Sequence, residues 1–283
     1  MIFFRFLAKV MNYIQNHFKA FLFLLIVFLV FNPFSSEVLR VPNLTTINLE
    51  GEISNIDNLL ASIEKASLDA NIKGVLLRVN SPGGALAPSI ELSMAIKRLS
   101  SLKPVVAYAS GSMTSGSYYA SIWTQKIIAN PGAFIGSIGV LFQAPNIEEF
   151  AKKIGISEQV ITAGAYKQMG TFTRKWSEKE RKALEELIED AYALFVSDVA
   201  NARGLKLEDA KEFADARVFI AQKAKEKGLI DAVGSLHVAQ IELEKMAHVS
   251  EPIWAKPSEM ELFLKELKGA NIFSLLNLKS GLM

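Results

Sequence analysis

Residues 74–110, GVLLRVNSPGGALAPSIELSMAIKRLSSLKPVVAYAS, decide the fold. The stretch opens with GVLLRVN, a short run of branched apolar residues that is typical of a buried strand. A proline and two glycines in SPGGAL then interrupt the chain. Apolar residues at helical spacing follow in PSIELSMAIKRLSS, and PVVAYAS forms a second apolar run. Strand, helix and strand in this order predict two parallel strands joined by a crossover helix.

The same alternation continues on both sides of this stretch. A capping-box pattern, Ser177 with Glu180, begins a long amphipathic helix that Gly204 ends. The sequence therefore predicts an α/β fold of repeated strand-helix units. The other expected elements are a strand in TINLEG (46–51), a helix in NIDNLLASIEKASLD (55–69), a helix through YYASIW (118–123), strands in KIIANP (126–131), GSIGVLF (136–142) and EQVITAG (158–164), and a closing strand-helix-turn unit in 216–235.

Composition excludes several classes of protein. The chain has 283 residues, half of them hydrophobic, and a net charge of +2, with no basic-aromatic stretch that would indicate nucleic-acid binding. It has no cysteine, which excludes thiol catalysis, disulfides and cysteine-ligated zinc. Its three histidines, His17, His237 and His248, form no HExxH pattern, so no metal site is expected.

The N-terminal region predicts a membrane anchor. Residues 20–31, AFLFLLIVFLVF, are continuously apolar, and with their flanks about 17 residues fit a short spanning helix. Arg5, Lys9 and Lys19 precede the run, and no acidic residue occurs before Glu37. This asymmetry predicts a single-pass protein with a cytoplasmic N-terminus. A cleaved signal peptide is the alternative, although no small-x-small cleavage site follows the run.

Three regions follow from these patterns. We expect residues 1–37 to form a cytoplasmic stub and transmembrane anchor, and residues 38–250 to form the α/β domain. Residues 251–283 form a tail that prolines 252 and 257 separate from the domain, with an amphipathic helix that needs a surface to cover its apolar face.

Two loops carry residues suited to catalysis. NSPGGA (80–85) and GSMTSGSYYAS (111–121) each follow a strand and precede a helix, and ligands gather at the carboxyl ends of parallel strands. Glycine N–H groups in such a loop can hold an oxyanion or a phosphate. Ser115, followed by Gly116, is the best placed nucleophile. An ordinary strand-to-helix turn with capping serines is the alternative interpretation of both loops.

A serine nucleophile needs a base, and a histidine is not well placed to supply it. His17 precedes the anchor, and the other two histidines lie late in the chain without a motif around them. A lysine can serve when burial favours its neutral amine. Lys167 in ITAGAYKQMG follows an apolar run and a turn of small residues, outside the charged helical stretches where most lysines lie. An exposed loop lysine is the alternative.

Five motifs in order resemble the short form of the signal peptide peptidase A family: GVLLRVNSPGGA, GSMTSGSYYAS, KIIANPGAFIGSIGV, ITAGAYKQMG and ARVFIAQKAKEKGLIDAVG. The resemblance covers roughly residues 45–240. It implies a ClpP/crotonase-like fold and a membrane-bound bacterial serine peptidase with a Ser-Lys dyad and no metal or cofactor.

The resemblance also assigns residues. It places the nucleophile on Ser115 and the lysine on Lys167, and the oxyanion donors would be Gly83 or Gly84 together with Gly116; Ser137 could orient the lysine. Two departures stand out in the serine loop, which is one residue shorter than the family's M-x-x-S-G-G-Y-Y and has Ser117 in place of the second glycine. The shortening keeps Ser112 as the alternative nucleophile.

The resemblance further implies a homo-oligomer with active sites at subunit interfaces, where the lysine and the serine can come from neighbouring subunits. The expected substrates are cleaved signal peptides, and the expected location is the bacterial inner membrane, with the catalytic domain periplasmic or extracellular. A crotonase-like acyl-CoA enzyme and a catalytically inactive membrane-anchored scaffold are the alternatives.

Overall fold

The structure, a computed structural model, describes residue 9 and residues 12–31 and 41–256. The chain forms two compact units, residues 1–41 and residues 42–283. In the first unit, helix α2 (Phe18–Phe31) comprises 14 residues, all apolar except Lys19. None of the helices in the described ranges is both long enough and apolar enough to cross a bilayer. The predicted anchor also includes residues outside these ranges, and it stays a prediction.

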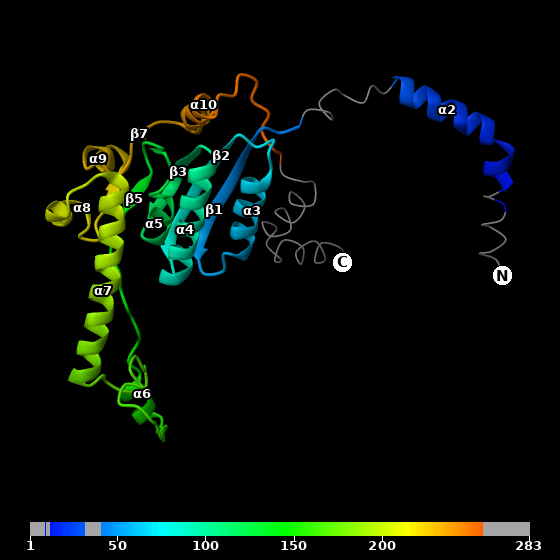
Figure 1. The fold of residues 1–283 in the computed structure, drawn as a ribbon. Coiled ribbons are helices and arrows are strands. Elements are labelled where there is room, and N and C mark those ends of the chain that lie inside the picture. Colours follow the sequence, from blue (N-terminus) through cyan, green and yellow to red (C-terminus); the bar gives the residue numbers. More distant parts are fainter. Residues whose placement is uncertain (1–8, 10–11, 32–40, 257–283) are drawn as a thin grey trace, which may run out of the picture. The chain divides into compact units, whose positions relative to one another are not determined.

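The second unit is built on a seven-stranded sheet (Figure 1). Its main path runs β1 (Leu44–Ile53), β2 (Gly74–Gly84), β3 (Val105–Thr114), β4 (Lys126–Ala129) and β7 (Ala232–Val233), with every neighbouring pair parallel. Strand β5 (Phe134–Gly136) pairs parallel with the end of β3, and β6 (Val218–Ile220) pairs antiparallel with β5. The predicted α/β fold with a parallel sheet is confirmed.

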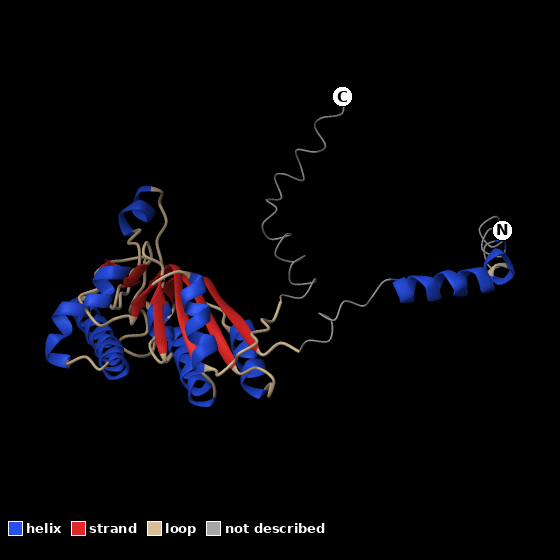
Figure 2. Ribbon diagram, turned by 90° about the horizontal axis from the view of Figure 1, so that it is seen from above, coloured by secondary structure: helices blue, strands red, loops and turns tan. Residues whose placement is uncertain are grey.

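Helices cover both faces of this sheet, as Figure 2 shows, and successive side chains of each strand therefore enter different cores. Val75 and Leu77 of β2 pack in the larger core, whereas Leu76 between them packs in a second core with Leu243. A strand buried on both faces needs a continuous apolar sequence, which explains GVLLRVN. The larger core contains side chains of α3 (Asp57–Leu68), α4 (Leu86–Leu102), α5 (Gly116–Ser121), α7 (Glu178–Arg203), α8 (Ala210–Phe213) and α9 (Ala221–Glu226), and the second core those of α10 (Leu236–Met246).

The start of the predicted tail joins this unit. Trp254 forms a parallel bridge with Leu44, and the Ala255 N–H donates to the Leu44 carbonyl over 2.8 Å. Residues 251–256 therefore continue the domain at the start of the edge strand β1. The predicted tail helix lies outside the described residues.

Helix α7 begins and ends as its sequence predicts. Ser177 and Glu180 form a reciprocal capping box, and Gly204 ends the helix in the left-handed conformation at φ 64°. A short 3-10 helix, η2 (Leu207–Asp209), follows.

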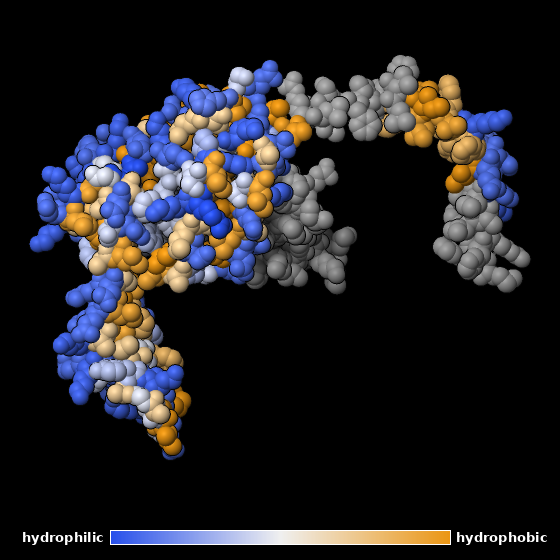
Figure 3. All heavy atoms as spheres, in the orientation of Figure 1, coloured by the Kyte–Doolittle hydropathy of each residue, from blue (hydrophilic) through white to orange (hydrophobic). Residues whose placement is uncertain are grey.

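Residues 140–177, which we call the extension, leave the sheet after β5 and end at the start of α7, which leads back toward the sheet. They contain one short helix, α6 (Glu148–Lys153), which lies beside the end of α7 remote from the sheet (Figure 1). Bonds within the extension include Ile147 N–H to Phe172 O at 2.9 Å. Figure 3 shows hydrophobic side chains gathered on its surface; the exposed ones include Leu141, Phe150, Ile156 and Ile161.

The strands predicted in the extension are wrong. EQVITAG is irregular throughout, and GSIGVLF contributes only its first residue to β5. An apolar run forms a strand only where a partner strand is available. Here Ile161 is fully exposed, because the run lies away from the sheet.

Candidate active site

The two glycine- and serine-containing loops lie against each other at the carboxyl ends of β2 and β3. Gly83 has φ 98°, a left-handed conformation that favours glycine. A β-carbon at this position would lie 2.6 Å from the Gly116 nitrogen and 2.9 Å from the Thr114 oxygen. Gly116 in turn packs against Ser89, since its own β-carbon would lie 2.2 Å from Ser89 Oγ. Glycine at position 83 allows the two loop backbones to touch, and glycine at position 116 allows the serine loop to pack against Ser89.

Ser115 stands at the turn between β3 and α5 in a strained conformation. Its φ of 52° and ψ of −126° are rare for any residue with a side chain. Two backbone hydrogen bonds stabilise this conformation. The Ser115 N–H donates to Gly136 O at 2.8 Å, and the Ser115 carbonyl accepts from Tyr119 N–H at 3.0 Å. Strain of this kind at a serine on a strand-to-helix turn indicates a functional position.

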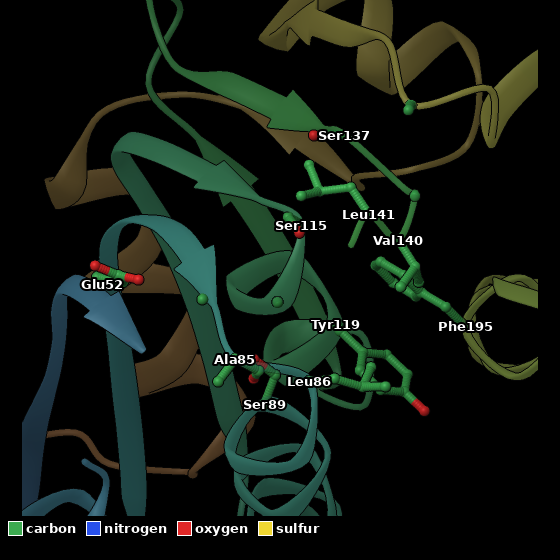
Figure 4. Close-up of a pocket in the computed structure, with 14 residues that line it drawn as sticks. Glu52, Ala85, Leu86, Ser89, Ser115, Tyr119, Ser137, Val140, Leu141 and Phe195 are labelled. Carbon is green, nitrogen blue, oxygen red and sulfur yellow. Dashed lines mark hydrogen bonds between the residues drawn. The ribbon is translucent and has the colours of Figure 1, made fainter. Parts of the chain in front are cut away.

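A cavity of about 430 Å³ opens beside Ser115. Figure 4 shows Ser115 facing it from the start of α5, with Ser137 and Leu141 on one side and Tyr119 and Phe195 farther along. Most of its lining is small or apolar, and Glu52 is the only carboxylate. The lining residues are Glu52, Gly84, Ala85, Leu86, Ser89, Ser115, Gly116, Tyr119, Ser137, Gly139, Val140, Leu141, Phe195 and Ala216.

Two backbone N–H groups are placed to bind an oxyanion in this cavity. Gly116 is the first residue of α5, so its N–H has no acceptor within the helix. The Gly84 nitrogen lies 3.3 Å from the β-carbon position of Gly116. Ile53 O accepts from Ala85, and because successive N–H groups of an extended segment point to opposite edges, Gly84 N–H points away from β1. Gly83 N–H already donates to Ser81 Oγ at 3.2 Å, which leaves Gly84 as the better donor.

Of two further serines near Ser115, Ser137 lines the cavity and Ser112 does not. Ser137, at φ 51°, lines the cavity together with Ser115, and its N–H donates to Arg217 O at 2.8 Å. Ser112 does not line the cavity. Its N–H donates to Asn80 Oδ1 and its hydroxyl pairs with Thr114 Oγ1, both at 3.0 Å, so it serves the loop structure.

Lys167 is not brought to this cavity within one chain. It is exposed in a turn of the extension, where its N–H donates to Gly164 O at 3.2 Å. Bonds of its neighbours stay local: Gln168 contacts Glu158 and Arg174. In the part of the chain that the structure describes, neither a lysine nor a histidine lines the cavity.

Sequence analysis missed the far wall of the cavity. Tyr119 lies one helical turn after Ser115, a spacing that could have indicated it. Its ring packs 4.7 Å from that of Phe195 in α7, and its hydroxyl donates to Asp198. Burial, reinforced by Asp198, raises the pKa of the Tyr119 phenol above its usual value, so the phenol stays protonated. No local sequence pattern predicts that Phe195, Ala216 and Ser89 line the cavity.

Within residues 9, 12–31 and 41–256, no three histidine, aspartate or glutamate side chains cluster to bind a metal. The chemistry available at the cavity is that of a serine hydroxyl beside two backbone donors. Such a site suits acyl transfer.

Comparison with known proteins decides the family. Residues 97–250, more than half of the chain, match the model of peptidase family S49. The chain belongs to peptidase family S49. The matched range includes the serine loop, Ser137 and Lys167, and relatives named SppA place the chain in the signal peptide peptidase A family.

Individual relatives agree. The S49 chain is 37% identical over 212 residues to a candidate protease of Methanocaldococcus jannaschii, covering 75% of this chain and 66% of the relative. It is 35% identical over 192 residues to a candidate signal peptide peptidase SppA of Enterococcus faecium, covering 68% and 56%. With a chloroplastic serine protease of Arabidopsis thaliana it shares 30% over 207 residues, covering 73% and 30%. The chain thus spans between about a third and two thirds of these relatives.

Among solved structures, the 1510-N membrane-bound stomatin-specific protease, in a serine-to-alanine variant, superposes with a TM-score of 0.51. Sequence identity is 14%, and the match covers 77% of this chain and all of the other. This similarity concerns the fold alone.

Proposed function

We propose that this S49 peptidase is a membrane-bound endopeptidase that degrades cleaved signal peptides with Ser115 as its nucleophile. The observation that carries the proposal is the strained Ser115 at the mouth of a largely apolar cavity, with the Gly84 and Gly116 N–H groups beside it. A relative named as a signal peptide peptidase supports the substrate class. The proposed fold type is ClpP/crotonase-like.

The mechanism is an acyl transfer in two halves. The Lys167 amine takes the Ser115 hydroxyl proton, and Oγ attacks the peptide carbonyl carbon. The Gly84 and Gly116 N–H groups hold the resulting oxyanion. When the C–N bond breaks, the lysine returns the proton to the leaving amine. A water molecule, deprotonated by the same lysine, then hydrolyses the acyl ester and frees Ser115.

Lys167 would come from a neighbouring subunit of a homo-oligomer. No described lysine of the same chain lines the cavity, and Lys167 lies exposed in the extension. The extension also exposes Phe150, Ile156 and Ile161, which contact with another protein surface would cover. A subunit that presents its extension to its neighbour would bury these side chains and deliver the lysine in one step.

The cavity suits apolar substrate side chains. Its lining includes Leu86, Tyr119, Leu141 and Phe195. The hydrophobic part of a signal peptide supplies apolar side chains that such a lining can bind. Ser137, facing the same cavity, is placed to accept a hydrogen bond from the incoming lysine. The apolar run at residues 20–31 would hold the enzyme in the inner membrane, with the catalytic domain on the outer side.

The test is a peptide-cleavage assay with the full chain in mild detergent. The substrate is a synthetic peptide with a basic start and an apolar run of signal-peptide type. We expect wild type to cleave it, Ser115→Ala and Lys167→Ala each to abolish cleavage, and Ser112→Ala to retain it. An assembled but inactive wild type would favour the inactive scaffold. Turnover of acyl-CoA substrates would favour the crotonase-like enzyme.

Mixing the two inactive variants tests the source of the lysine. If Ser115 and Lys167 act across an interface, coexpressed Ser115→Ala and Lys167→Ala chains regain about a quarter of the active sites by random assembly. If both residues act within one chain, the mixture stays inactive.

A further inference from the structure

We propose that the Ser117 hydroxyl is a positioning group that holds the two oxyanion loops in register, an inference that rests on the proposed function. Ser117 is the second residue of α5 and is fully buried. It does not line the cavity, so it acts on the reaction only through its neighbours.

The hydroxyl of Ser117 connects both loops. It donates to the Ser81 carbonyl in the glycine loop at 2.7 Å, with Thr114 O as a second acceptor at 2.9 Å. It also accepts from the Thr114 N–H at 2.9 Å. Ser81 precedes Gly83 by two residues, and Thr114 directly precedes Ser115. One buried hydroxyl therefore joins the segments that carry the two proposed oxyanion donors.

The backbone ladder alone does not fix this junction. Strands β2 and β3 pair regularly up to Val79, after which a register shift precedes the final pair of Ser81 with Met113. Beyond the shift, side chains supply the cross-links. Asn80 Oδ1 accepts from Ser112 N–H, and Ser117 accepts and donates as described. Of these links, the Ser117 hydroxyl lies nearest to the serine nucleophile in sequence.

The spacing of the two donors leaves little tolerance. The Gly116 nitrogen already lies 2.6 Å from where a β-carbon on Gly83 would be, so the loops are in contact. Oxyanion donors act only when they are held at the position where the charge develops. The serine loop of this chain is one residue shorter than the pattern it resembles and carries Ser117 where that pattern has glycine. In this shorter serine loop, the Ser117 hydroxyl supplies a hydrogen bond to the glycine loop that a glycine could not make.

Ser121 provides a matched control. It is buried on the same helix, one turn later, and its hydroxyl donates only to the Ser117 carbonyl within α5 at 2.8 Å. Ser121→Ala therefore removes a buried serine hydrogen bond of similar kind without removing a bond between the two loops. Ser117→Cys keeps the shape of the side chain with a somewhat larger sulfur atom and leaves only the weaker hydrogen bonds of a thiol.

The experiment compares these variants in the full chain by kcat and KM for the cleaved peptide. We expect Ser117→Ala to lower kcat about tenfold with KM changed less than about twofold, because donors held for the transition state are displaced. Ser117→Cys should fall between it and wild type, and Ser121→Ala should keep the wild-type kcat. Hydrogen exchange should accelerate at residues 81–85 and 111–117 in the Ser117 variants, most in Ser117→Ala, and not in Ser121→Ala.

Equal kcat values for Ser117→Ala and Ser121→Ala would overturn the inference, as would a rise in KM with kcat unchanged. If Ser117→Ala does not fold, the kcat of Ser117→Cys decides by the same criterion. Failure of the proposed function would look different, since wild type itself would then be inactive. In that case unchanged exchange at residues 81–85 in the Ser117 variants would still overturn the positioning role.

Discussion

Replacing Gly83 with alanine tests how closely the two loops must approach. The new methyl group would lie 2.6 Å from the Gly116 nitrogen and 2.9 Å from both Ser115 Cβ and Thr114 O. Non-bonded atoms do not approach so closely, and two of these neighbours are rigid backbone. One loop must therefore move away from the other, and each carries one proposed oxyanion donor.

The expected magnitudes follow from two separate costs. Placing a β-carbon at φ 98° costs about 1–2 kcal/mol of stability through left-handed strain alone. Displacing one oxyanion donor lowers kcat by about 10²–10³-fold, which corresponds to roughly 3–4 kcal/mol at the transition state. We therefore predict a modestly destabilised protein whose kcat falls at least about a hundredfold.

Gly204→Ala separates the two costs. Gly204 has φ 64° at the end of α7, and nothing lies within 4 Å of its β-carbon position. This variant should also lose about 1–2 kcal/mol of stability and keep its kcat. Thermal unfolding and peptide cleavage, measured on both variants, give the two quantities. A Gly83→Ala enzyme with near-wild-type kcat would refute the assignment of these loops to the oxyanion site.

Three further perturbations address the cavity wall and the extension. Leu141→Ala, which trims a largely exposed side chain of the cavity, should raise KM for peptides with a bulky apolar residue at the cleavage site more than for peptides with alanine there; equal effects on both would contradict the apolar subsite. Tyr119→Phe should cost about 1 kcal/mol in urea unfolding, because it removes the bond to Asp198 while keeping the ring, with kcat unchanged; a large loss of kcat would instead give the phenol a role in the reaction. The Arg174 guanidinium, and to a smaller extent the Ser177 N–H, lower the pKa of the Glu180 carboxyl from 4.5 to about 2. The stability that the ionised Glu180 contributes is therefore present above pH 4.5 and is lost as the pH falls from there toward 2. The Tm difference between wild type and Glu180→Gln should therefore be present at pH 7 and vanish near pH 2, and a constant difference would contradict this pairing.

The elements that the sequence predicted correctly are those with local causes. Branched apolar runs bounded by glycine and proline identified β2 and β3, and the reciprocal pattern of Ser177 and Glu180 identified the start of α7. EQVITAG was mistaken for a strand because strand formation depends on a distant partner, and the extension offers it none. Local apolar character does not reveal whether a segment reaches the sheet.

Some residues of the candidate site can be predicted from sequence order, and others depend on tertiary packing. Ser115, Gly84, Gly116 and Ser137 converge because they follow adjacent parallel strands, which sequence order can predict. Phe195 belongs to the long helix that the sequence predicts, but its place beside Tyr119 depends on how α7 packs. The partners of the Ser117 hydroxyl likewise become visible only in three dimensions, because Ser81 lies 36 residues away.

Ser115 is the proposed nucleophile, and covalent labelling with a fluorophosphonate identifies the serine that reacts. The reagent forms a covalent bond to the oxygen of an activated serine, and fragmentation of the labelled peptide by mass spectrometry then locates the adduct within residues 111–121. The proposed mechanism predicts one adduct per chain, on Ser115, and none in Ser115→Ala. An adduct on Ser112, or labelling that persists in Ser115→Ala, would contradict it.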